Sequence, residues 1–326
     1  MNAVIICSVL TAASSISILV LDNNEKEKNF TNDNNQTTNS SSATLTVQSS
    51  KDAGLDKFGI AKLYATKTSG REWFSNWDNG HARTFINSID PDDNWFDTNH
   101  GDGKYIVDGR GEMTASGSTV RMYVHDPAKS VEWAEDMEIT VYITRINETQ
   151  MVSYSGLQIF ARTNHGTNGD ETVNLCDDRG YGGKVTIDGR WEFEKEIRHE
   201  SDKGYSIIGT YKPWSGLPKD TQVGVKYILH NMAVGTRVKV ELYRDMTNGL
   251  NGGTWEKMTE FIDDGTNWGV KQSSCKLGVD PAMQLIRIFT LASSETKKPE
   301  LSVYARHEYG TMKYEKFSIR EINPLP

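Results

Sequence analysis

Short segments in which apolar and polar residues alternate fill the sequence from about residue 56 to residue 322. A period of two is that of a β-strand with one face buried and the other in water. Turn-forming stretches rich in Gly, Asn and Asp separate the segments, and no long stretch carries a helical period. The expected strands are 119–126, 137–146, 155–163, 189–199, 222–231, 236–245, 283–291, 299–307 and 312–322.

This pattern predicts the fold class. The sequence shows neither an internal repeat, as a propeller requires, nor the strand–helix alternation of a parallel sheet. Many strands joined by turns within one unit, 56–326, indicate an all-β, antiparallel two-sheet β-sandwich of the jelly-roll, concanavalin-like type. The chain has a net charge of −8, which argues against a nucleic-acid partner and against a polybasic membrane-surface protein.

The N-terminal region differs from the rest in composition. Residues 3–21 are apolar and uncharged, so we expect 1–21 to be a secretory signal peptide or an N-terminal membrane anchor. Residues 22–55 are rich in Asn, Ser and Thr and predict a disordered linker. Together they predict an extracellular or cell-surface glycoprotein that meets a membrane only through the anchor; N-glycosylation sequons stand at Asn29, Asn35, Asn39 and Asn147.

Two cysteines remain once the leader is set aside. In an exported domain Cys176 and Cys275 would form one disulfide. The alternative is a pair of free buried thiols.

Alternation also assigns side chains to faces. In 190–197 the residues Trp191, Phe193 and Ile197 point to the core, and Arg190, Glu192 and Glu194 point away from it. The same reading of the other strands gives outward faces rich in Arg, Lys, His, Gln, Glu and Tyr. Their candidate binding residues are Arg121, Tyr123, Glu194, His230, Tyr304 and Arg306.

If these strands are neighbours, the shared face suits a polysaccharide. Guanidinium groups bind carboxylates through two hydrogen bonds, and Tyr rings stack on the apolar faces of sugars. The mixture therefore indicates an anionic polysaccharide lying in a groove. The alternative is a solvated face whose Arg and Glu side chains pair across strands.

Three stretches carry a family resemblance. "RWE" (190–192), "LQIFAR" (157–162) and "VKYILHN" (225–231) resemble the Arg-x-Glu, Gln-Ile-His and Tyr/Lys strands of jelly-roll polysaccharide lyases of the alginate-lyase and glucuronan-lyase type, with Phe160 where that family has His. The resemblance covers roughly 56–322. It implies a concanavalin-like sandwich that cleaves a uronate-containing polysaccharide by β-elimination.

β-Elimination needs a group that neutralises the carboxylate, a base for the C5 proton and an acid for the leaving oxygen. Gln158, Arg162 and Arg190 are suited to the first task. A His (His165, His199 or His230) suits the second, and a Tyr (Tyr205, Tyr211 or Tyr243) the third. The candidate catalytic residues are Gln158, Arg162, His165, Arg190, Glu192, His199, Lys226 and Tyr243.

Other functions stay open. Glu192 and Glu194 lie two residues apart on one strand face, as a pair of carboxylates in a glycoside hydrolase would. A non-catalytic carbohydrate-binding or adhesion module would use the same face without a reaction. A purely structural surface protein would bind no glycan.

An acidic segment is the candidate metal site. "DPDDNWFD" (90–97) places Asp90, Asp92, Asp93 and Asp97 close together in sequence, and oxygen-rich loops hold Ca²⁺. A second such segment is 244–253. The alternative is an acidic turn whose Asp and Asn side chains bond the local backbone. No cofactor is expected to be required, and a structural Ca²⁺ ion is the candidate ligand of the acidic segment.

Overall fold

The computed structural model describes residues 53–152, 154–165, 179–197, 205–232, 236–269, 282–285 and 301–324. They belong to one compact unit, Thr44–Pro326. Every pairing of named strands is antiparallel, and the helical structure in the described part is one short 3₁₀ turn, η2 (Leu250–Gly252). The strands are β1 (Glu72–Phe74), β2 (Arg83–Ile86), β3 (Ile89–Asp90), β4 (Asp93–Asp97), β5 (Lys104–Val107), β6 (Glu112–Val124), β7 (Met137–Glu148), β8 (Gly156–Thr163), β9 (Gly180–Thr186), β10 (Arg190–Glu196), β11 (Tyr205–Thr210), β12 (Gln222–Asn231), β13 (Val238–Asp245), β14 (Glu256–Asp263) and β15 (Ser302–Glu321).

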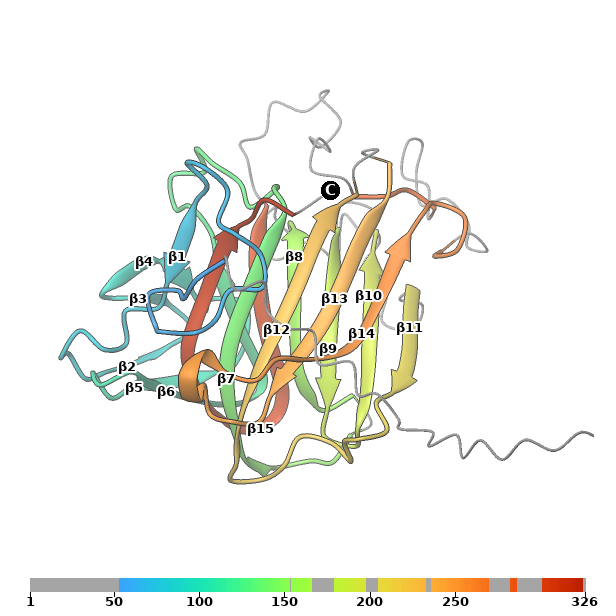
Figure 1. Ribbon diagram of the computed structural model, residues 1–326. Coiled ribbons are helices and arrows are strands. Elements are labelled where there is room, and N and C mark those ends of the chain that lie inside the picture. Colours follow the sequence, from blue (N-terminus) through green and yellow to red (C-terminus); the bar gives the residue numbers. More distant parts are fainter. Residues whose placement is uncertain are drawn as a thin grey trace, which may run out of the picture. The chain divides into compact units, whose positions relative to one another are not determined.

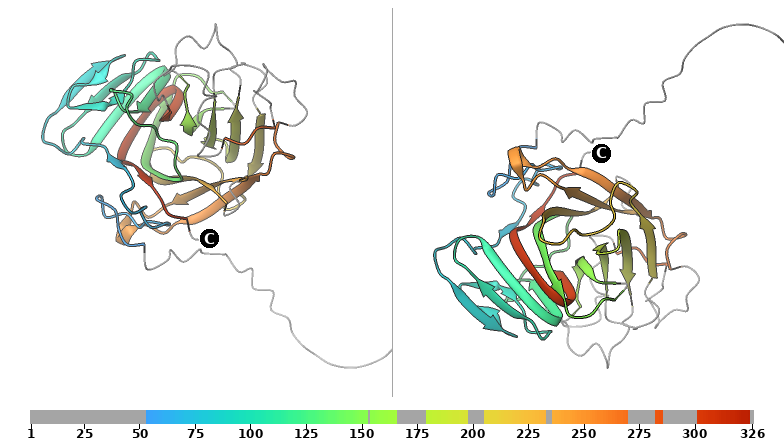
Figure 2. Two further views of the ribbon diagram at one scale, coloured as in Figure 1. Left: turned by 90° about the horizontal axis from the view of Figure 1, so that it is seen from above. Right: turned by 90° about the horizontal axis from the view of Figure 1, so that it is seen from below.

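The strands form two packed layers (Figures 1 and 2). The first layer has the order β11-β10-β9-β8-β15-β6, and the second has the order β14-β13-β12-β7-β15. β15 belongs to both layers, because its first half pairs with β8 and its second half with β7. The short strands β1 to β5 pair among themselves or with β6 and β15. The predicted all-β antiparallel sandwich is confirmed.

The core lies between the layers. Leu157, Ile159, Val185 and Phe193 from the first layer and Val225, Tyr227, Leu229, Val240 and Leu242 from the second are at most 1% exposed and share one cluster. The rings of Phe193 and Tyr227 lie 6.5 Å apart across the layers. A Cβ at Gly183 would stand 2.5 Å from the Tyr227 ring, so this position in β9 requires glycine for the layers to approach. The core parity predicted for 120–124, 157–161 and 191–197 is confirmed at these apolar positions.

β15 departs from the predicted strand pattern. The sequence predicts two strands, 299–307 and 312–322, whereas the structure has one strand of 20 residues. Tyr309 and Lys316 have φ angles of 50° within it, in the left-handed region. The register against β7 shifts between Thr311 and Met312 and again between Glu315 and Ser318. Such bulges interrupt the alternation without ending the strand, which is why the sequence reads as two segments.

Residues 53–70, here called the strap, cross the outer face of the second layer. Ile60 and Leu63 of the strap pack against Tyr142, Ile228 and Trp255 in a separate apolar cluster. The backbone N–H groups of Leu63 and Tyr64 donate to the Glu138 carboxylate, at 3.1 and 3.0 Å. We call this the covered face. The outer face of the first layer, which the strap does not cross, is called the open face, although its central residues in β8 and β9 are buried.

Candidate functional site

The open face carries most of the residues predicted to bind or act on substrate. Strand register aligns them in two rows that run across the strands. The first row is Glu192, Lys184, Gln158, Arg306 and Arg121; the second is Glu194, Gly182, Phe160, Tyr304 and Tyr123. The structure thus brings together Arg121, Tyr123, Gln158, Glu192, Glu194, Tyr304 and Arg306.

The first row is polar and internally bonded. The Lys184 ammonium lies 2.9 Å from Glu192, and the Nε of Arg306 donates to Gln158 at 2.6 Å. Gln158 in turn donates its Nε2 to Glu194 at 2.6 Å. The row therefore presents donors and acceptors in fixed positions.

Two members of this network escaped the sequence analysis. Lys184 lies in β9, a Gly-rich strand whose alternation is weak, and Glu308 lies at the β15 bulge, where it bonds Arg121 at 2.7 Å. Lys184 follows "GYGG". Glycines stand there at positions where the apolar residues of an alternating strand would be expected, so the strand pattern is hard to recognise. For Glu308 the available sequence signal is its spacing, because it follows Tyr304 and Arg306 at intervals of two residues and so shares their face.

Three members of the second row, Phe160, Tyr304 and Tyr123, are aromatic and buried. Tyr123 and Tyr304 stack with ring centres 4.5 Å apart and planes 8° apart, and Phe160 stacks on Tyr304 at 5.7 Å. A Cβ at Gly182 would lie 2.9 Å from the Phe160 ring, so this glycine makes room for it. Phe160 therefore completes an aromatic stack at the position where the lyase resemblance would place a base.

His165 joins this stack from the segment just after β8. Its Nδ1 lies 3.2 Å from the Tyr123 hydroxyl, and its ring stacks on Tyr304 at 5.1 Å. Burial raises the pKa of Tyr304, an effect that nearby Arg306 and Arg121 partly oppose. A titratable His and two Tyr side chains thus stand beside Arg306 and Gln158, although Tyr123 and Tyr304 are 0% exposed.

The accessible groups are Glu192, Arg306 and Arg121 of the first row and the residues at its rim, whereas Gln158 and Lys184 are 1% and 6% exposed. The side chains of Arg306 and Glu308 are 24% and 14% exposed, and Tyr154, close to both, is 47% exposed. Arg121 and Lys184 each have a carboxylate partner. Charges on this face therefore pair across strands, as the alternative reading of the sequence anticipated, and a ligand would meet oriented pairs rather than isolated cations.

Arg162 is a correction. It was predicted to share the face of Gln158, but its φ of 50° and the register shift between β8 and β15 turn the side chain inward. There it is 2% exposed and donates to Asp136 and Asn231 at 2.9 and 2.7 Å and to the Leu285 carbonyl. Burial lowers the pKa of this guanidinium while Asp136 opposes the shift. Arg162 ties chain segments together and lies away from the open face.

Lys226, His230 and Tyr243 are a second correction. Their outward parity is right, but they belong to the second layer and lie on the covered face. Lys226 is 1% exposed and bonds Glu138 at 2.6 Å; Tyr243 donates to Glu241 at 3.1 Å, and His230 lies 3.6 Å from the same carboxylate. Alternation cannot tell which layer a strand joins.

The other predicted residues fall elsewhere. Arg190 stands at the start of β10, where it bonds Asp188 at 2.9 Å at the rim of the open face. Tyr211 lies under the Arg244 guanidinium, away from both rows. His199, Cys176 and Cys275, with the expected disulfide, lie outside the described residues, as does the side chain of Tyr205.

Lys195 was overlooked despite a plain signal. Lys195 stands between Phe193 and Ile197 at an inward-facing position of 190–197, where alternation predicts an apolar residue. Its side chain is 0% exposed and bonds Asp263 at 2.9 Å and the Trp268 carbonyl at 2.8 Å, while Tyr181 donates to the same carboxylate at 2.6 Å. A charge on a buried parity predicts such a buried ion pair.

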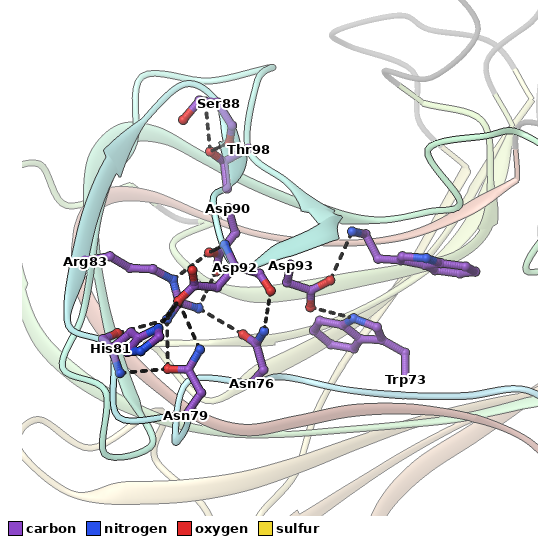
Figure 3. A network of polar contacts seen from close by, with 11 residues as sticks. Trp73, Asn76, Asn79, His81, Arg83, Ser88, Asp90, Asp92, Asp93 and Thr98 are labelled. Carbon is purple, nitrogen blue, oxygen red and sulfur yellow. Dashed lines mark hydrogen bonds and ion pairs between the residues drawn. The ribbon is translucent and has the colours of Figure 1, made fainter.

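The acidic segment does not gather its carboxylates around a common point (Figure 3). Arg83 binds both oxygens of Asp90, at 2.5 and 2.6 Å, and lies 3.3 Å from Asp92. Asp93 accepts from the Trp73 indole, and Asp97 faces His125 at 3.2 Å. In the other segment Asp245 accepts from backbone and hydroxyl groups of its own loop. Nowhere in the described part do three or more His, Cys, Asp or Glu side chains form a group that could hold a metal ion.

Comparison with known proteins finds similar structures but no similar sequence. No protein-family model matches the chain, and no curated protein matches it in sequence. Its similar solved structures include the exoplasmic/lumenal domain of VIP36 bound to Ca²⁺ and Man₃GlcNAc (TM-score 0.41, 10% identity, covering 76% of this chain and 92% of that one). A seed lectin of Lotus tetragonolobus has a TM-score of 0.38 with 11% identity, covering 76% and 100% of the two chains. A putative glycosyl hydrolase from Parabacteroides distasonis has 0.36 with 9% identity, covering 67% and 83%.

These TM-scores are too low to transfer a function. The part of the chain that the structure describes contains no helix long and apolar enough to cross a membrane.

Proposed function

We propose that the protein binds an extended polysaccharide across the open face. The observation that best supports this proposal is the first row. On neighbouring strands it places side by side Glu192, Lys184, Gln158, Arg306 and Arg121. Neighbouring strands lie about 4.8 Å apart, close to the length of one sugar unit, so each sugar would meet the side chain of one strand. Oriented amide, guanidinium and carboxylate groups suit hydroxyl and carboxylate groups of the polymer.

The cationic half of the row favours an acidic polymer. Arg121 and Arg306 stand side by side in the row, at 2.7 and 3.9 Å from Glu308, and Glu194 and Glu196 also act electrostatically on Arg306. Carboxylates of the polymer would meet these two adjacent guanidiniums. The other end of the row, with Glu192 and Glu194, is acidic and would meet neutral parts of the polysaccharide. We also propose, from residues 1–55, that the protein acts outside the cell or at its surface.

The binding test uses purified protein and a panel of uronate-containing and neutral polysaccharides, with calorimetry as the readout. Arg306→Gln should weaken binding of the preferred polymer about tenfold to a hundredfold, since a hydrogen bond to a charged group contributes about 1.5–3 kcal/mol. Lys313→Gln is the matched control, because Lys313 also pairs with a glutamate, at 2.9 Å, away from the rows. If no polymer binds, or both variants bind equally, the proposal fails.

β-Elimination is the second candidate function. His165, Tyr123 and Tyr304 lie in contact beside Gln158 and Arg306, so a base, an acid and carboxylate-binding groups occur together. The unsaturated uronate product absorbs in the ultraviolet. His165→Gln should lower the rate of that absorbance rise by about 10²–10⁴-fold. Binding without any rise would leave a binding module; new reducing ends without the rise would indicate a hydrolase.

The hydrolase alternative has less support. Glu192 is engaged by the Lys184 ammonium and the Ser206 hydroxyl, and Glu194 accepts from Gln158. Both carboxylates are therefore already bound by protein donors, whereas a hydrolase needs them directed at the glycosidic bond.

A further inference from the structure

An open cavity of about 550 Å³ lies at one end of the sandwich, apart from both rows of the open face. It is bounded by the ends of β7 and β13, by the turn between β9 and β10, and by the loop between β11 and β12. The described residues that line it are Arg145, Ile187, Pro213, Trp214, Ser215, Gly216, Leu217, Pro218, Arg244 and Met246.

The loop wall of this cavity is fixed in place. The Leu217 N–H donates to the Thr186 carbonyl at 3.1 Å, and the Leu217 carbonyl accepts from Arg145 at 2.8 Å. Gly216 has a φ of 130°, and a Cβ there would stand 2.0 Å from the Ile187 carbonyl oxygen. The loop therefore seats directly on the β9–β10 turn, and the cavity is formed before any ligand arrives.

Arg244 is the preorganised polar group of the cavity. It is 7% exposed, and its guanidinium lies over the rings of Tyr211 and Trp214, at 4.9 and 5.5 Å. Its Nε and Nη2 donate to Glu256 at 3.1 and 2.9 Å. The Tyr211 hydroxyl also interacts with the guanidinium. A guanidinium that packs against two aromatic rings and is bonded along one edge has little entropy left to lose when a ligand binds it.

The rest of the wall defines the ligand. Its described lining residues include two guanidiniums and no carboxylate, which favours an anion. Arg145 is hydrogen-bonded to Glu148 and to the Leu217 carbonyl. One charged edge, that of Arg244, therefore remains to bind the anion. Trp214, Met246 and two prolines supply apolar surface, and the exposed Ser215 supplies a hydroxyl.

We propose that this cavity binds an acidic monosaccharide unit, a hexuronate, with its carboxylate on Arg244 Nη1 and its ring against Trp214 and Met246. An aromatic wall takes the apolar face of a sugar, and one guanidinium edge takes one carboxylate. The site is independent of the polysaccharide function proposed for the open face.

The test is an NMR and calorimetric titration of the whole protein with glucuronate and galacturonate against glucose and galactose. Each uronate should bind saturably, and the matching neutral sugar at least tenfold more weakly. Arg244→Lys should weaken uronate binding about tenfold. Arg110→Gln, an exposed arginine far from the cavity, should change nothing.

Two further variants keep the proposal falsifiable. Met246→Glu alters a side chain that is 41% exposed, so the fold tolerates it, and it places a carboxylate at the mouth that should repel uronate. Arg306→Gln on the open face should leave uronate binding intact even where polymer binding is lost. Absence of saturable binding, equal affinity for neutral sugars, unchanged binding by Met246→Glu, or loss of binding by Arg306→Gln would each overturn the proposal.

Discussion

The two outer faces of the sandwich use the same residue types for different ends. Each sets Lys, Arg, Glu and Tyr side chains outward from neighbouring strands. On the covered face the strap buries them, and Glu138 is 0% exposed between Lys226, Arg320 and two backbone N–H groups. On the open face the Lys184 and Glu192 side chains stay 7% and 14% exposed. The strap therefore buries the polar groups of one face, while the other face, which it does not cross, keeps part of its polar row in contact with water.

The largest expected effect separates the faces by stability. Glu138→Gln leaves the Lys226 and Arg320 charges buried without their carboxylate, so we expect a loss of about 3–5 kcal/mol in the free energy of unfolding. Glu308→Gln on the open face, where Arg121 can turn to water, should lose less than about 1 kcal/mol. Urea denaturation of the two variants measures both. Equal losses would show that the faces do not differ in this way.

The second expectation concerns pH. Burial lowers the pKa of His307, beneath the open face, from 6.5 to about 4. A depressed pKa favours the neutral folded form, so its stability is full above about pH 6.5 and falls by about 3 kcal/mol as the pH drops to 4. Lys226 and Arg320 hold the pKa of Glu138 below 4.5 despite burial, so the covered face weakens only below that value.

Urea denaturation across this pH range checks the difference. His307→Gln should remove the pH dependence of the free energy of unfolding between pH 6.5 and 4, and should leave the loss of stability below pH 4 unchanged. A variant that keeps the full slope in the upper window would contradict the assignment to His307.

The third expectation concerns the strap. Tyr64 donates its hydroxyl to Glu241 at 2.7 Å, and Tyr64→Phe should cost about 1.5–3 kcal/mol, the range for a hydrogen bond to a charged group. Tyr154→Phe, at an exposed tyrosine beside the open face, should stay within about 0.5 kcal/mol. Thermal unfolding of the two variants gives the contrast; similar shifts would mean that the strap contributes little through this bond.

The smallest effect sharpens the description of the open face. A double-mutant cycle on Lys184 and Glu192, with Gln at each position, should give a coupling of about 0.2–1 kcal/mol, because the Glu192 side chain is 14% exposed and still meets water although Lys184 is 7% exposed. A coupling of several kcal/mol would place this pair with the buried pairs of the covered face, and would weaken the case that the row is free to meet a ligand.

Sequence reasoning succeeded where alternation alone decides the outcome. It placed Phe193 and Ile159 inward and Gln158, Arg306 and Glu192 outward, and these three meet on one face. The all-β architecture followed from the same period.

It failed where the information lies outside the local pattern. The left-handed φ of Arg162 reverses a side chain without changing the sequence period. Lys226 and Glu192 look alike along the chain, yet they join different layers, which depends on strand pairing between distant segments. The strap covers one of these layers through contacts more than 70 residues apart in sequence, such as Leu63 with Glu138.

β15 has a consequence for the order in which the molecule can be assembled. It pairs with β1, β6, β7 and β8, all of which precede it along the chain, and it joins the two layers. During synthesis those strands emerge from the ribosome with an unfilled slot between β7 and β8 until residues 302–321 appear. Contacts between such distant segments form slowly, and exposed strand edges invite aggregation in the meantime. The nascent chain would therefore benefit from chaperone protection until β15 has been made.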